Sequence, residues 1–438
     1  MQFNVFKNTV FPIIIGTVLA MISCANLSKK KDDTKVAKDE GLLLIEFSDA
    51  SKKNEILTKD QKDKVISVGA NLTDIYLPLL KGKRVGVVAN QTSVIFKNKE
   101  LKSKKLSYTH LVDSLIALKI DIKKVFSPEH GFRGNADAGE LVKDGVDIKT
   151  GLPIISLHGK HKKPSAKQLE NLDVVIFDIQ DVGARFYTYI STLHYVMEAC
   201  AESNIPLLVL DRPNPNGHYF DGPTLKIENK SFLGMHPIPL VHGMTIGEYA
   251  QMINGEKWLD KEAQCKVTII PVKNYTHSTF YSLPIRPSPN LPNDQSIKLY
   301  PSLGLFEGTN INAGRGTEFQ FQRFGAPFLD KNVLKFSYTP VANFGAKHPK
   351  HKGVVCYGKD LKDEDLHGVM TLKWVIEAYK NTTDKSLFFN TANFTTHAGT
   401  DILQKQIESG LTEKEIKETW KADLETFKNT RSKYLIYD

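Results

Sequence analysis

The feature that most constrains the fold is an alternation of short apolar segments and helical patterns between residues 84 and 210. The predicted strands are residues 84–90, 120–126, 153–157, 174–179 and 206–210. The predicted helices between them are residues 110–118, 165–171 and 185–203. Because continuous apolar strands are buried on both faces, this pattern predicts an α/β fold with a doubly wound, mostly parallel sheet.

Polar side chains follow every predicted strand. They are Asn90 and Gln91, then Glu129 and His130, then His158, then Asp178, Gln180 and Asp181, and finally Asp211 and Arg212. In open α/β sheets, ligands bind at the carboxyl edge of the strands. The sequence therefore predicts a functional site at this edge. The alternative is that these loops are polar only because loops are exposed to water.

The loop at residues 126–140 is the densest in reactive groups. It holds two glutamates, an aspartate, a histidine and an arginine among three glycines. Charged side chains in a loop add little stability, because they must be solvated or paired, and catalytic residues concentrate on such loops. We take Glu129 as the leading catalytic candidate. Glu140, in the same loop, is the candidate for a second carboxylate.

The first 60 residues are predicted to precede the folded body. Lys7 comes before an apolar segment, residues 10–22, which is typical of a secretory signal and short for a membrane span. Residues 21–24 resemble a bacterial lipobox, in which Cys24 would carry the lipid; a plain signal peptide is the alternative. We predict a signal peptide at 1–24, a flexible tether at 25–60 and an exported lipoprotein in the periplasm or outer membrane, held there only through Cys24.

Two domains are expected for 438 residues. The proline-rich segment 212–217 ends the strand and helix alternation, so we predict a catalytic domain at 61–225 and a smaller α+β auxiliary domain at 226–438. Capping boxes, in which a threonine precedes a glutamate by three residues, predict helix starts at Thr245 and Thr412. The second domain also has a predicted strand at 265–272, predicted helices at 246–257, 366–379 and 412–427, and polar loops at 286–292 and 307–317.

Several functional classes lack their sequence signals. The net charge is +9, but the lysines are scattered without interleaved aromatic residues, so no nucleic-acid partner is expected. The turn at residues 89–94 has no glycine and the P-loop pattern is absent, so no nucleotide cofactor is expected. Cys200, Cys265 and Cys356 are widely spaced, which indicates neither a zinc site nor a redox pair.

Serine hydrolases and metal-dependent hydrolases are the two alternatives to a glycosidase, and the sequence lacks the motif of each. The G-x-S-x-G elbow of serine hydrolases is absent. A metal-dependent hydrolase remains a minor alternative, because the H-E-x-x-H motif is absent although possible ligands exist. Those possible ligands are His130, His158, His161, Asp178 and Asp211. We therefore expect no bound metal.

Paired carboxylates suit glycoside hydrolysis, in which one acid protonates the leaving oxygen and the other attacks or activates water. Besides Glu129 and Glu140, aspartates at the strand ends are available. Four arginines lie in or beside glycine-rich or proline-rich loops and predict an anionic substrate, unless each pairs with a nearby acid. They are Arg133, Arg185, Arg212 and Arg315. Tyr187 lies off the apolar stripe of its helix and could face a sugar, whereas Phe186 and Tyr189 are expected in the core.

Long motifs occur in a fixed order along the chain. They are residues 127–134 (SPEHGFRG), 138–140 (AGE), 150–153 (TGLP), 177–190 (FDIQDVGARFYTYI), 210–215 (LDRPNP), 242–247 (HGMTIG), 287–290 (PSPN), 307–310 (EGTN) and 314–317 (GRGT). Together they resemble the bacterial exo-β-N-acetylmuramidase family. The resemblance covers the chain from about Arg84 to its end. One departure is Gln320-Phe-Gln322, where many relatives have Pro-Phe-Glu, and we assign these glutamines no role.

The resemblance implies release of N-acetylmuramic acid (MurNAc) from the non-reducing end of peptidoglycan fragments such as its disaccharide with N-acetylglucosamine (GlcNAc). It also implies a Rossmann-like catalytic domain, a smaller C-terminal domain, a cleft between them and Glu129 as the catalytic glutamate. The lactyl carboxylate of MurNAc would explain the arginines. The substrate-binding candidates are His130, Arg133, Asp178, Gln180, Asp181, Arg185, Tyr187, Arg212, Asn214, His242, Asn290, Glu307, Asn310 and Arg315. The rival hypothesis outside enzymes is a lipoprotein that binds cell-wall glycans, and the second enzymatic alternative is a metal-dependent hydrolase of cell-wall amides or phosphoesters.

Overall fold

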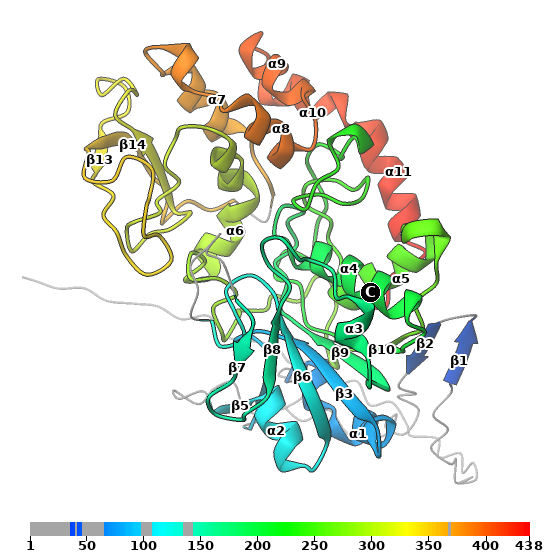
Figure 1. Cartoon of the computed structure of the whole chain (residues 1–438). Coiled ribbons are helices and arrows are strands. Elements are labelled where there is room, and N and C mark those ends of the chain that lie inside the picture. Colours follow the sequence, from blue (N-terminus) through cyan, green and yellow to red (C-terminus); the bar gives the residue numbers. More distant parts are fainter. Residues whose placement is uncertain (1–35, 40–41, 46–64, 98–106, 135–142, 367–368) are drawn as a thin grey trace, which may run out of the picture.

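The structure, a computed structural model of the chain, describes residues 36–39, 42–45, 65–97, 107–134, 143–366 and 369–438. Within these residues the main sheet has nine strands in the order β1-β2-β11-β10-β9-β3-β6-β8-β7 (Figure 1). The strands are β1 (Val36–Asp39), β2 (Leu42–Ile45), β3 (Arg84–Ala89), β6 (Asp121–Ser127), β7 (Gly145–Val146), β8 (Pro153–Ser156), β9 (Val174–Asp178), β10 (Leu207–Leu210) and β11 (Val267–Ile270). All neighbours from β2 to β8 pair in parallel, while the edge strands β1 and β7 are antiparallel, which confirms the predicted sheet.

The sheet is doubly wound. From β3 the chain moves outward through β6 to β8, and β9, β10 and β11 then extend on the other side of β3. The strand order therefore reverses between β3 and β9, which is where open α/β sheets usually bind ligands. On one face lie α1 (Thr73–Leu80) and α2 (Leu111–Ala117), and on the other lie α3 (Ala166–Leu169), α4 (Tyr189–Glu202) and α5 (Ile246–Gly255).

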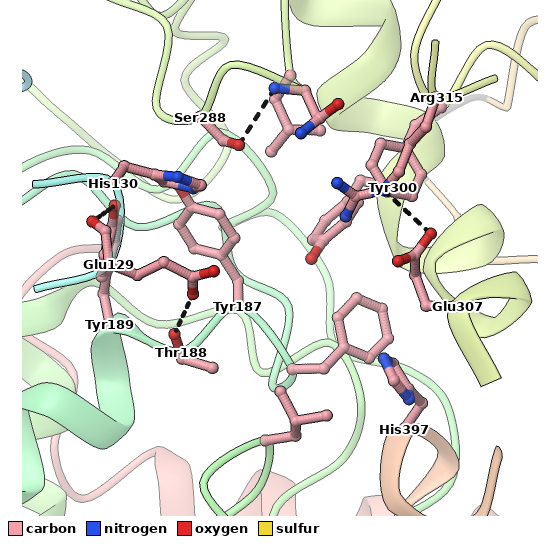
Figure 2. Close-up of a pocket in the computed structure, with 15 residues that line it drawn as sticks. Glu129, His130, Tyr187, Thr188, Tyr189, Ser288, Tyr300, Glu307, Arg315 and His397 are labelled. Carbon is pink, nitrogen blue, oxygen red and sulfur yellow. Dashed lines mark hydrogen bonds and ion pairs between the residues drawn. The ribbon is translucent and has the colours of Figure 1, made fainter. Parts of the chain in front are cut away.

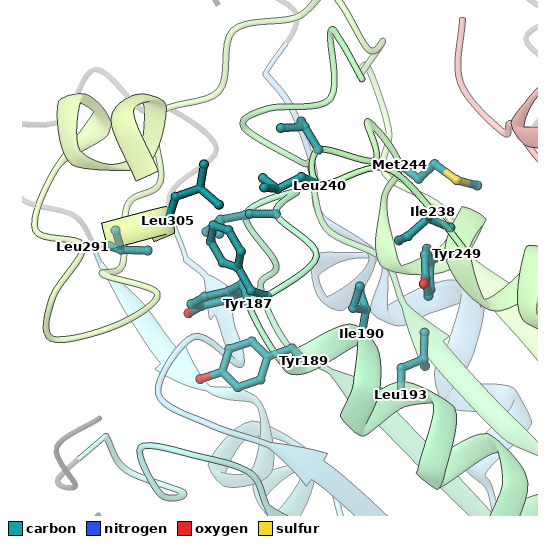
Figure 3. Packing of buried hydrophobic residues seen from close by; sticks show 14 of the residues in the cluster. Tyr187, Tyr189, Ile190, Leu193, Ile238, Leu240, Met244, Tyr249, Leu291 and Leu305 are labelled. Carbon is teal, nitrogen blue, oxygen red and sulfur yellow. The ribbon is translucent and has the colours of Figure 1, made fainter. Parts of the chain in front are cut away.

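Two hydrophobic cores sandwich the sheet, because side chains alternate between the faces of each strand. Val87 of β3 packs with the helices α1 and α2, whereas the next residue, Val88, packs with α4 and α5. In the core between the sheet and the helices α4 and α5, Ile190 and Leu193 of α4 lie beside Tyr249 of α5 (Figure 3). This core continues without a break into the second domain.

The second domain is α+β, as predicted. A small antiparallel sheet has the order β12-β14-β13, with strands β12 (Arg323–Ala326), β13 (Phe336–Tyr338) and β14 (Cys356–Asp360). Its helices are α6 (Asp294–Leu303), α7 (Lys373–Lys380), α8 (Thr391–Ala398), α9 (Ile402–Glu408), α10 (Glu413–Thr419) and α11 (Lys421–Arg431), and α7 to α11 arch over the molecule in Figure 1. The chain end returns to the first domain, where the Tyr437 hydroxyl donates to Asp211 at 2.7 Å.

Short elements complete the described chain. A hairpin pairs β4 (Val94–Phe96) with β5 (Tyr108–His110). The 3-10 helices are η2 (Gly69–Asn71), η3 (Ile227–Asn229), η4 (Asp260–Glu262), η5 (Gly304–Gly308) and η6 (Lys385–Leu387). Both predicted capping boxes are present, from Thr245 to Glu248 at α5 and from Thr412 to Glu415 at α10. No helix in the described ranges is both long and apolar enough to cross a membrane.

The structure differs from several expected boundaries. The main sheet continues past the predicted domain end at residue 225, because β11 pairs with β10. The strands β1 and β2 lie within the predicted tether, and the rest of residues 25–60 lies outside the described residues. Helix α4 begins at Tyr189 instead of residue 185, because the Arg185 side chain points into the protein and donates to distant backbone carbonyls. The predicted helix 366–379 begins at Lys373, and residues 412–427 form two helices.

Candidate active site

A pocket opens where the two domains meet, and it encloses about 620 Å³ of space, part of it open to solvent. The first domain supplies the loop after β6 and the residues that lead into α4, while the second supplies α6, η5, α8 and the loop before β12. The lining residues are Glu129, His130, Phe186, Tyr187, Thr188, Tyr189, Leu233, Ser288, Asn290, Leu291, Tyr300, Glu307, Arg315, Phe321 and His397. Figure 2 shows Glu129 on one side of this pocket and Glu307 with Arg315 on the other.

A tight turn after β6 presents Glu129 to the pocket. The Gly131 amide donates to the Pro128 carbonyl at 3.1 Å, and His130 between them has a φ of 70°. This left-handed conformation costs a non-glycine residue on the order of 1 kcal/mol and persists where the surroundings enforce it, commonly at functional sites. On the far side of Glu129, the Thr188 hydroxyl donates to its carboxylate and the Tyr189 hydroxyl to its carbonyl, both at 3.4 Å.

Glu307 and Arg315 form the opposite wall. Arg315 Nε donates to Glu307 Oε1 at 3.2 Å. Burial alone would raise the pKa of Glu307, but the positive charges of Arg315 and Lys350 outweigh it and hold the pKa below its usual value. Gly308, the next residue, allows close approach of α8, because a Cβ there would lie 2.4 Å from Phe394 Cα.

Aromatic side chains join the two walls. Tyr189 and Tyr187 meet edge to face with ring centroids 4.9 Å apart, and Tyr187 then lies 6.0 Å from Tyr300 of α6. Tyr300 in turn meets Phe321 at 4.8 Å. The Tyr187 hydroxyl donates to the Pro287 carbonyl at 2.7 Å, which fixes the loop 286–292. Edge-to-face contacts are one of the favourable arrangements of aromatic rings, so these side chains link the two domains at the pocket.

Six of the predicted site residues line this pocket: Glu129, His130, Tyr187, Asn290, Glu307 and Arg315. Glu140 lies outside the described residues. Among the described residues, Glu307 is therefore the second carboxylate of the pocket. The aspartates predicted as partners at the strand ends are buried elsewhere, since Asp211, for example, accepts bonds from Thr245, Gly247 and Tyr437.

Asp178 and Arg212, predicted as substrate ligands, form a buried ion pair and do not line this pocket. Arg212 Nε lies 2.6 Å from Asp178 Oδ1, and Arg212 Nη2 lies 2.9 Å from Oδ2. Both side chains are almost fully buried, with exposed fractions of 3% and 0%. The pair lies at the carboxyl ends of β9 and β10, next to the point where the strand order reverses.

The four candidates Gln180, Asp181, Asn214 and His242 also lie outside the lining of this pocket and contact protein groups. Gln180 donates to the Asp181 and Pro213 carbonyls, and Asn214 donates to the Met244 carbonyl. Asp181 accepts from the Gly183 amide at 2.7 Å, and His242 Nε2 lies 3.4 Å from it. All four are at most 5% exposed, so they hold together the loops that follow β9 and β10.

Arg133, predicted to bind substrate, forms ion pairs with acids of its own domain and does not line the pocket. Its Nη2 lies 2.9 Å from Asp113 and 2.8 Å from Asp147. Burial raises the pKa of Asp147, but the hydrogen bonds from Arg133 and Thr150 outweigh it and hold the value at about 2.

Arg185 and Asn310, also predicted to bind substrate, donate to backbone carbonyls and do not line the pocket. Arg185 is fully buried, and its Nη atoms donate to the carbonyls of Pro223, Ile238, His397 and Ala398. Burial lowers the pKa of Arg185 to about 9. Asn310 is exposed and donates to the Leu387 carbonyl at 2.8 Å. Arg185 thus joins the first domain to the end of α8.

Several pocket residues were not singled out from the sequence. Phe186 and Tyr189 were expected in the core, and they are buried but also line the pocket. Ser288 lay inside a quoted motif, which was a usable signal. Thr188, Leu291 and Phe321 also lay within segments noted from the sequence, whereas Leu233, Tyr300 and His397 had no local signal. Gln322 accepts from Asn293 at the start of α6 and does not line the pocket.

Metal ligands do not gather in the described part of the chain: no group of three or more His, Cys, Asp or Glu side chains there could hold a metal ion. Of the five ligands considered for the metal-dependent alternative, Asp178 and Asp211 are already bonded within the protein. His130 is the member of that set that lines the pocket.

Comparison with known proteins identifies the family. Residues 85–295 match the model of the N-terminal domain of exo-beta-N-acetylmuramidase NamZ, and residues 298–437 match the model of its C-terminal domain. The chain belongs to the exo-beta-N-acetylmuramidase NamZ family. This confirms the family inferred from the motifs and the predicted class of enzyme, a glycoside hydrolase. The two models divide near residue 296 and not at 225, in agreement with the extent of the sheet.

Similar proteins cover nearly the whole chain. The peptidoglycan beta-N-acetylmuramidase NamZ of Bacillus subtilis (strain 168) is 40% identical over 399 residues, which are 86% of this chain and 92% of that protein. A crystal structure of a DUF1343 family protein from Bacteroides fragilis NCTC 9343 is 44% identical with a TM-score of 0.76, over 85% of this chain and 99% of that one. A second DUF1343 protein of that organism is 26% identical with a TM-score of 0.72, over 86% and 100%.

Proposed function

We propose that this protein is an exo-acting β-N-acetylmuramidase that releases MurNAc from the non-reducing end of peptidoglycan fragments such as MurNAc-GlcNAc. The observation that carries the proposal is a single pocket with a glutamate on one wall and an arginine paired to a second glutamate on the other. Family membership and the relative in Bacillus subtilis support the choice of substrate.

Glu129 is proposed as the general acid. Its carboxyl group lies at the pocket, beside the Thr188 hydroxyl, where it can donate a proton to the oxygen of the leaving GlcNAc. Glu307 is the second carboxylate of the pocket within the described residues, and the charges of Arg315 and Lys350 favour its ionised form. An ionised carboxylate opposite the acid can stabilise the positive charge that develops on the sugar ring.

Arg315 is proposed to bind the lactyl carboxylate that distinguishes MurNAc from GlcNAc. Its Nε is engaged by Glu307, and its guanidinium lies 5.3 Å from the Phe321 ring. Arg315 lines the pocket, and the Nη edge of its planar fork is the part that would bind a carboxylate with two hydrogen bonds. Pairing with Glu307 holds this fork in one orientation before the sugar binds.

The substrate assignment is tested by product analysis. Incubation with MurNAc-GlcNAc is expected to release both sugars, while GlcNAc-MurNAc, with the opposite sugar at the non-reducing end, is expected to stay intact. NMR during the reaction gives the first anomer formed and hence the stereochemistry. Binding of the disaccharide without release would instead show a glycan-binding protein, and loss of activity on chelation would show a metal-dependent hydrolase.

Replacement of Arg315 by glutamine is expected to abolish the preference for MurNAc. A hydrogen bond to a charged group contributes about 1.5–3 kcal/mol, so kcat/KM for a chromogenic β-N-acetylmuramide should fall by roughly 10- to 100-fold. The matching β-N-acetylglucosaminide, which lacks the lactyl group, should lose much less. Arg84→Gln at the amino end of β3 is the control, since Arg84 pairs with Asp173 outside the pocket. Equal losses on both substrates would contradict the assignment.

Export and lipidation at Cys24 are also proposed, on the strength of the sequence of residues 1–24. In a cell that expresses the full chain, the protein is expected in the membrane fraction and labelled by a fatty-acid probe. Cys24→Ser should remove the label and release the protein. A labelled Cys24→Ser protein, or an unlabelled wild-type protein, would contradict the anchor.

A further inference from the structure

Lys350 occupies an unusual position behind the second wall of the pocket. It lies in the connection between β13 and β14, far along the chain from η5, yet its Nζ reaches the end of η5. There it lies 2.9 Å from the carbonyl oxygen of Phe306, 3.2 Å from that of Glu307, 2.6 Å from that of Thr309 and 3.4 Å from that of Ile311. Four backbone carbonyls thus surround one ammonium group.

The ammonium group of Lys350 provides hydrogen-bond donors for backbone carbonyls at the end of η5. Phe306 and Glu307 belong to the last turn of η5, while Thr309 and Ile311 follow it, and carbonyl oxygens at a helix end carry partial negative charge. Lysine brings a compact charge with three donors, which suits a ring of carbonyls better than a planar guanidinium does. The segment that Lys350 organises carries Glu307, whose carboxylate bonds Arg315. Any shift of η5 would therefore move both charged groups of this wall.

The electrostatic surroundings point the same way. Glu307 faces the cations Arg315 and Lys350, and His397 of α8 and Tyr300 of α6 are its other titratable neighbours. Burial lowers the pKa of Lys350, and the charge of Glu307 opposes that effect. Glu129, on the other wall, acts on Arg315 in the same sense as Glu307 does. Lys350 and Arg315 are thus the cations that keep Glu307 in its charged form.

We propose that Lys350 is a positioning residue of the active site, which holds η5 in place and thereby keeps the Glu307 carboxylate against Arg315. It touches neither sugar nor reacting atoms and acts through Glu307. The proposal rests on the proposed function, because it takes the wall of Glu307 and Arg315 to be the one that receives the sugar. It adds a residue outside the pocket lining to the residues that determine activity.

The test compares Lys350→Met and Lys350→Gln with Lys352→Met, an exposed lysine two residues further on. Lys350→Met is expected to lower kcat/KM for the β-N-acetylmuramide by about tenfold or more, as expected when a charged hydrogen-bond donor is lost. In the pH–activity profile of this variant, the fall in activity on the acid side should move to higher pH. Without Lys350 the pKa of Glu307 is higher, so Glu307 gains its proton at a higher pH. Lys350→Gln keeps two N–H donors without the charge, so it should show the same pH shift with a smaller loss of folded protein.

A double-mutant comparison separates positioning from general stability. If Lys350 acts through Glu307, Lys350→Met should cost no more than about twofold in a Glu307→Gln background, because coupled residues are not additive. A merely structural role predicts a lower melting temperature and less folded protein, but an unchanged pH profile for the folded fraction. That result, or a full tenfold cost in the Glu307→Gln background, would overturn the proposal.

A binding readout keeps this test apart from that of the proposed function. Failure of the proposed function would appear in the wild-type protein, as no release of MurNAc. Calorimetric titration with free MurNAc does not depend on turnover, and Lys350→Met is expected to weaken that binding by about tenfold. Equal affinities of wild type and Lys350→Met would overturn the role of Lys350, whichever reaction the protein catalyses.

Discussion

Glu129→Gln is expected to lower the rate of MurNAc release from MurNAc-GlcNAc by roughly 10²–10⁴-fold, the usual contribution of a general acid. Glutamine keeps the size of the side chain and its contact with the Thr188 hydroxyl, but it cannot deliver a proton. The protein should fold as the wild type does, because the turn at His130 and Gly131 is made by the backbone. The measurement is kcat for the disaccharide, with circular dichroism and melting temperature as checks of folding.

The leaving group gives this prediction a sharper form. A sugar hydroxyl needs a proton in order to leave, whereas nitrophenolate leaves without one. The loss in Glu129→Gln should therefore be much smaller for a nitrophenyl β-N-acetylmuramide than for the disaccharide if Glu129 is the acid. Equal losses on both substrates would assign Glu129 another role. Glu318→Gln, an exposed glutamate in the loop of Arg315, is the matched control and should retain full activity. Disaccharide activity near the wild-type rate in Glu129→Gln would remove Glu129 from the mechanism.

Arg212→Met is expected to cause the largest loss of stability, about 3–5 kcal/mol, because it leaves a buried carboxylate without its partner. Asp178 is fully buried, and it forms an ion pair with Arg212 at 2.6 Å. The free energy of unfolding in urea measures the loss. Arg84→Met is the control, since it removes an exposed pair with Asp173 and should cost at most about 1 kcal/mol.

The pH dependence of Arg212→Met checks the cause. Burial already raises the pKa of Asp178, and Arg212 lowers it, so the variant should have a still higher value. A carboxyl group with a raised pKa in the folded state binds its proton more tightly there than in the unfolded chain. The variant should therefore lose least stability at acid pH and progressively more as pH rises past the usual carboxyl range. Asp178→Asn in the same chain should restore much of the loss, and a loss independent of pH would point to packing instead.

Local pattern was enough to predict much of the fold. The apolar segments that end near Ala89, Ser127, Ser156, Asp178 and Leu210 became the parallel strands β3, β6, β8, β9 and β10. Each such strand is buried on both faces, so a continuous run of apolar residues marks it in the sequence. The capping boxes at Thr245 and Thr412 were correct for the same reason, since both partners lie within one turn of helix. The late start of α4 was missed because it depends on Arg185 bonding distant carbonyls.

The local sequence pattern did not predict which polar side chains reach the pocket. Every predicted strand was followed by polar groups, but the groups at the ends of β9 and β10 turned toward each other, as Arg212 and Asp178 do. The end of β6 instead delivers Glu129 and His130 to the pocket. The local sequence cannot separate these outcomes. An acid that pairs with another protein group and an acid that faces a pocket are of the same residue type and follow a strand in the same way.

The sequence by itself determined the parallel sheet, the loop that carries Glu129 and, through its motifs, the family. Only the tertiary structure decided which carboxylate lies across the pocket from Glu129, which of the four arginines lines that pocket, and that Lys350 lies behind Glu307. The reason is physical: strands and caps are set by neighbours in the chain, whereas a pocket is set by groups such as Glu129, Glu307 and His397, which come together only when the two domains pack.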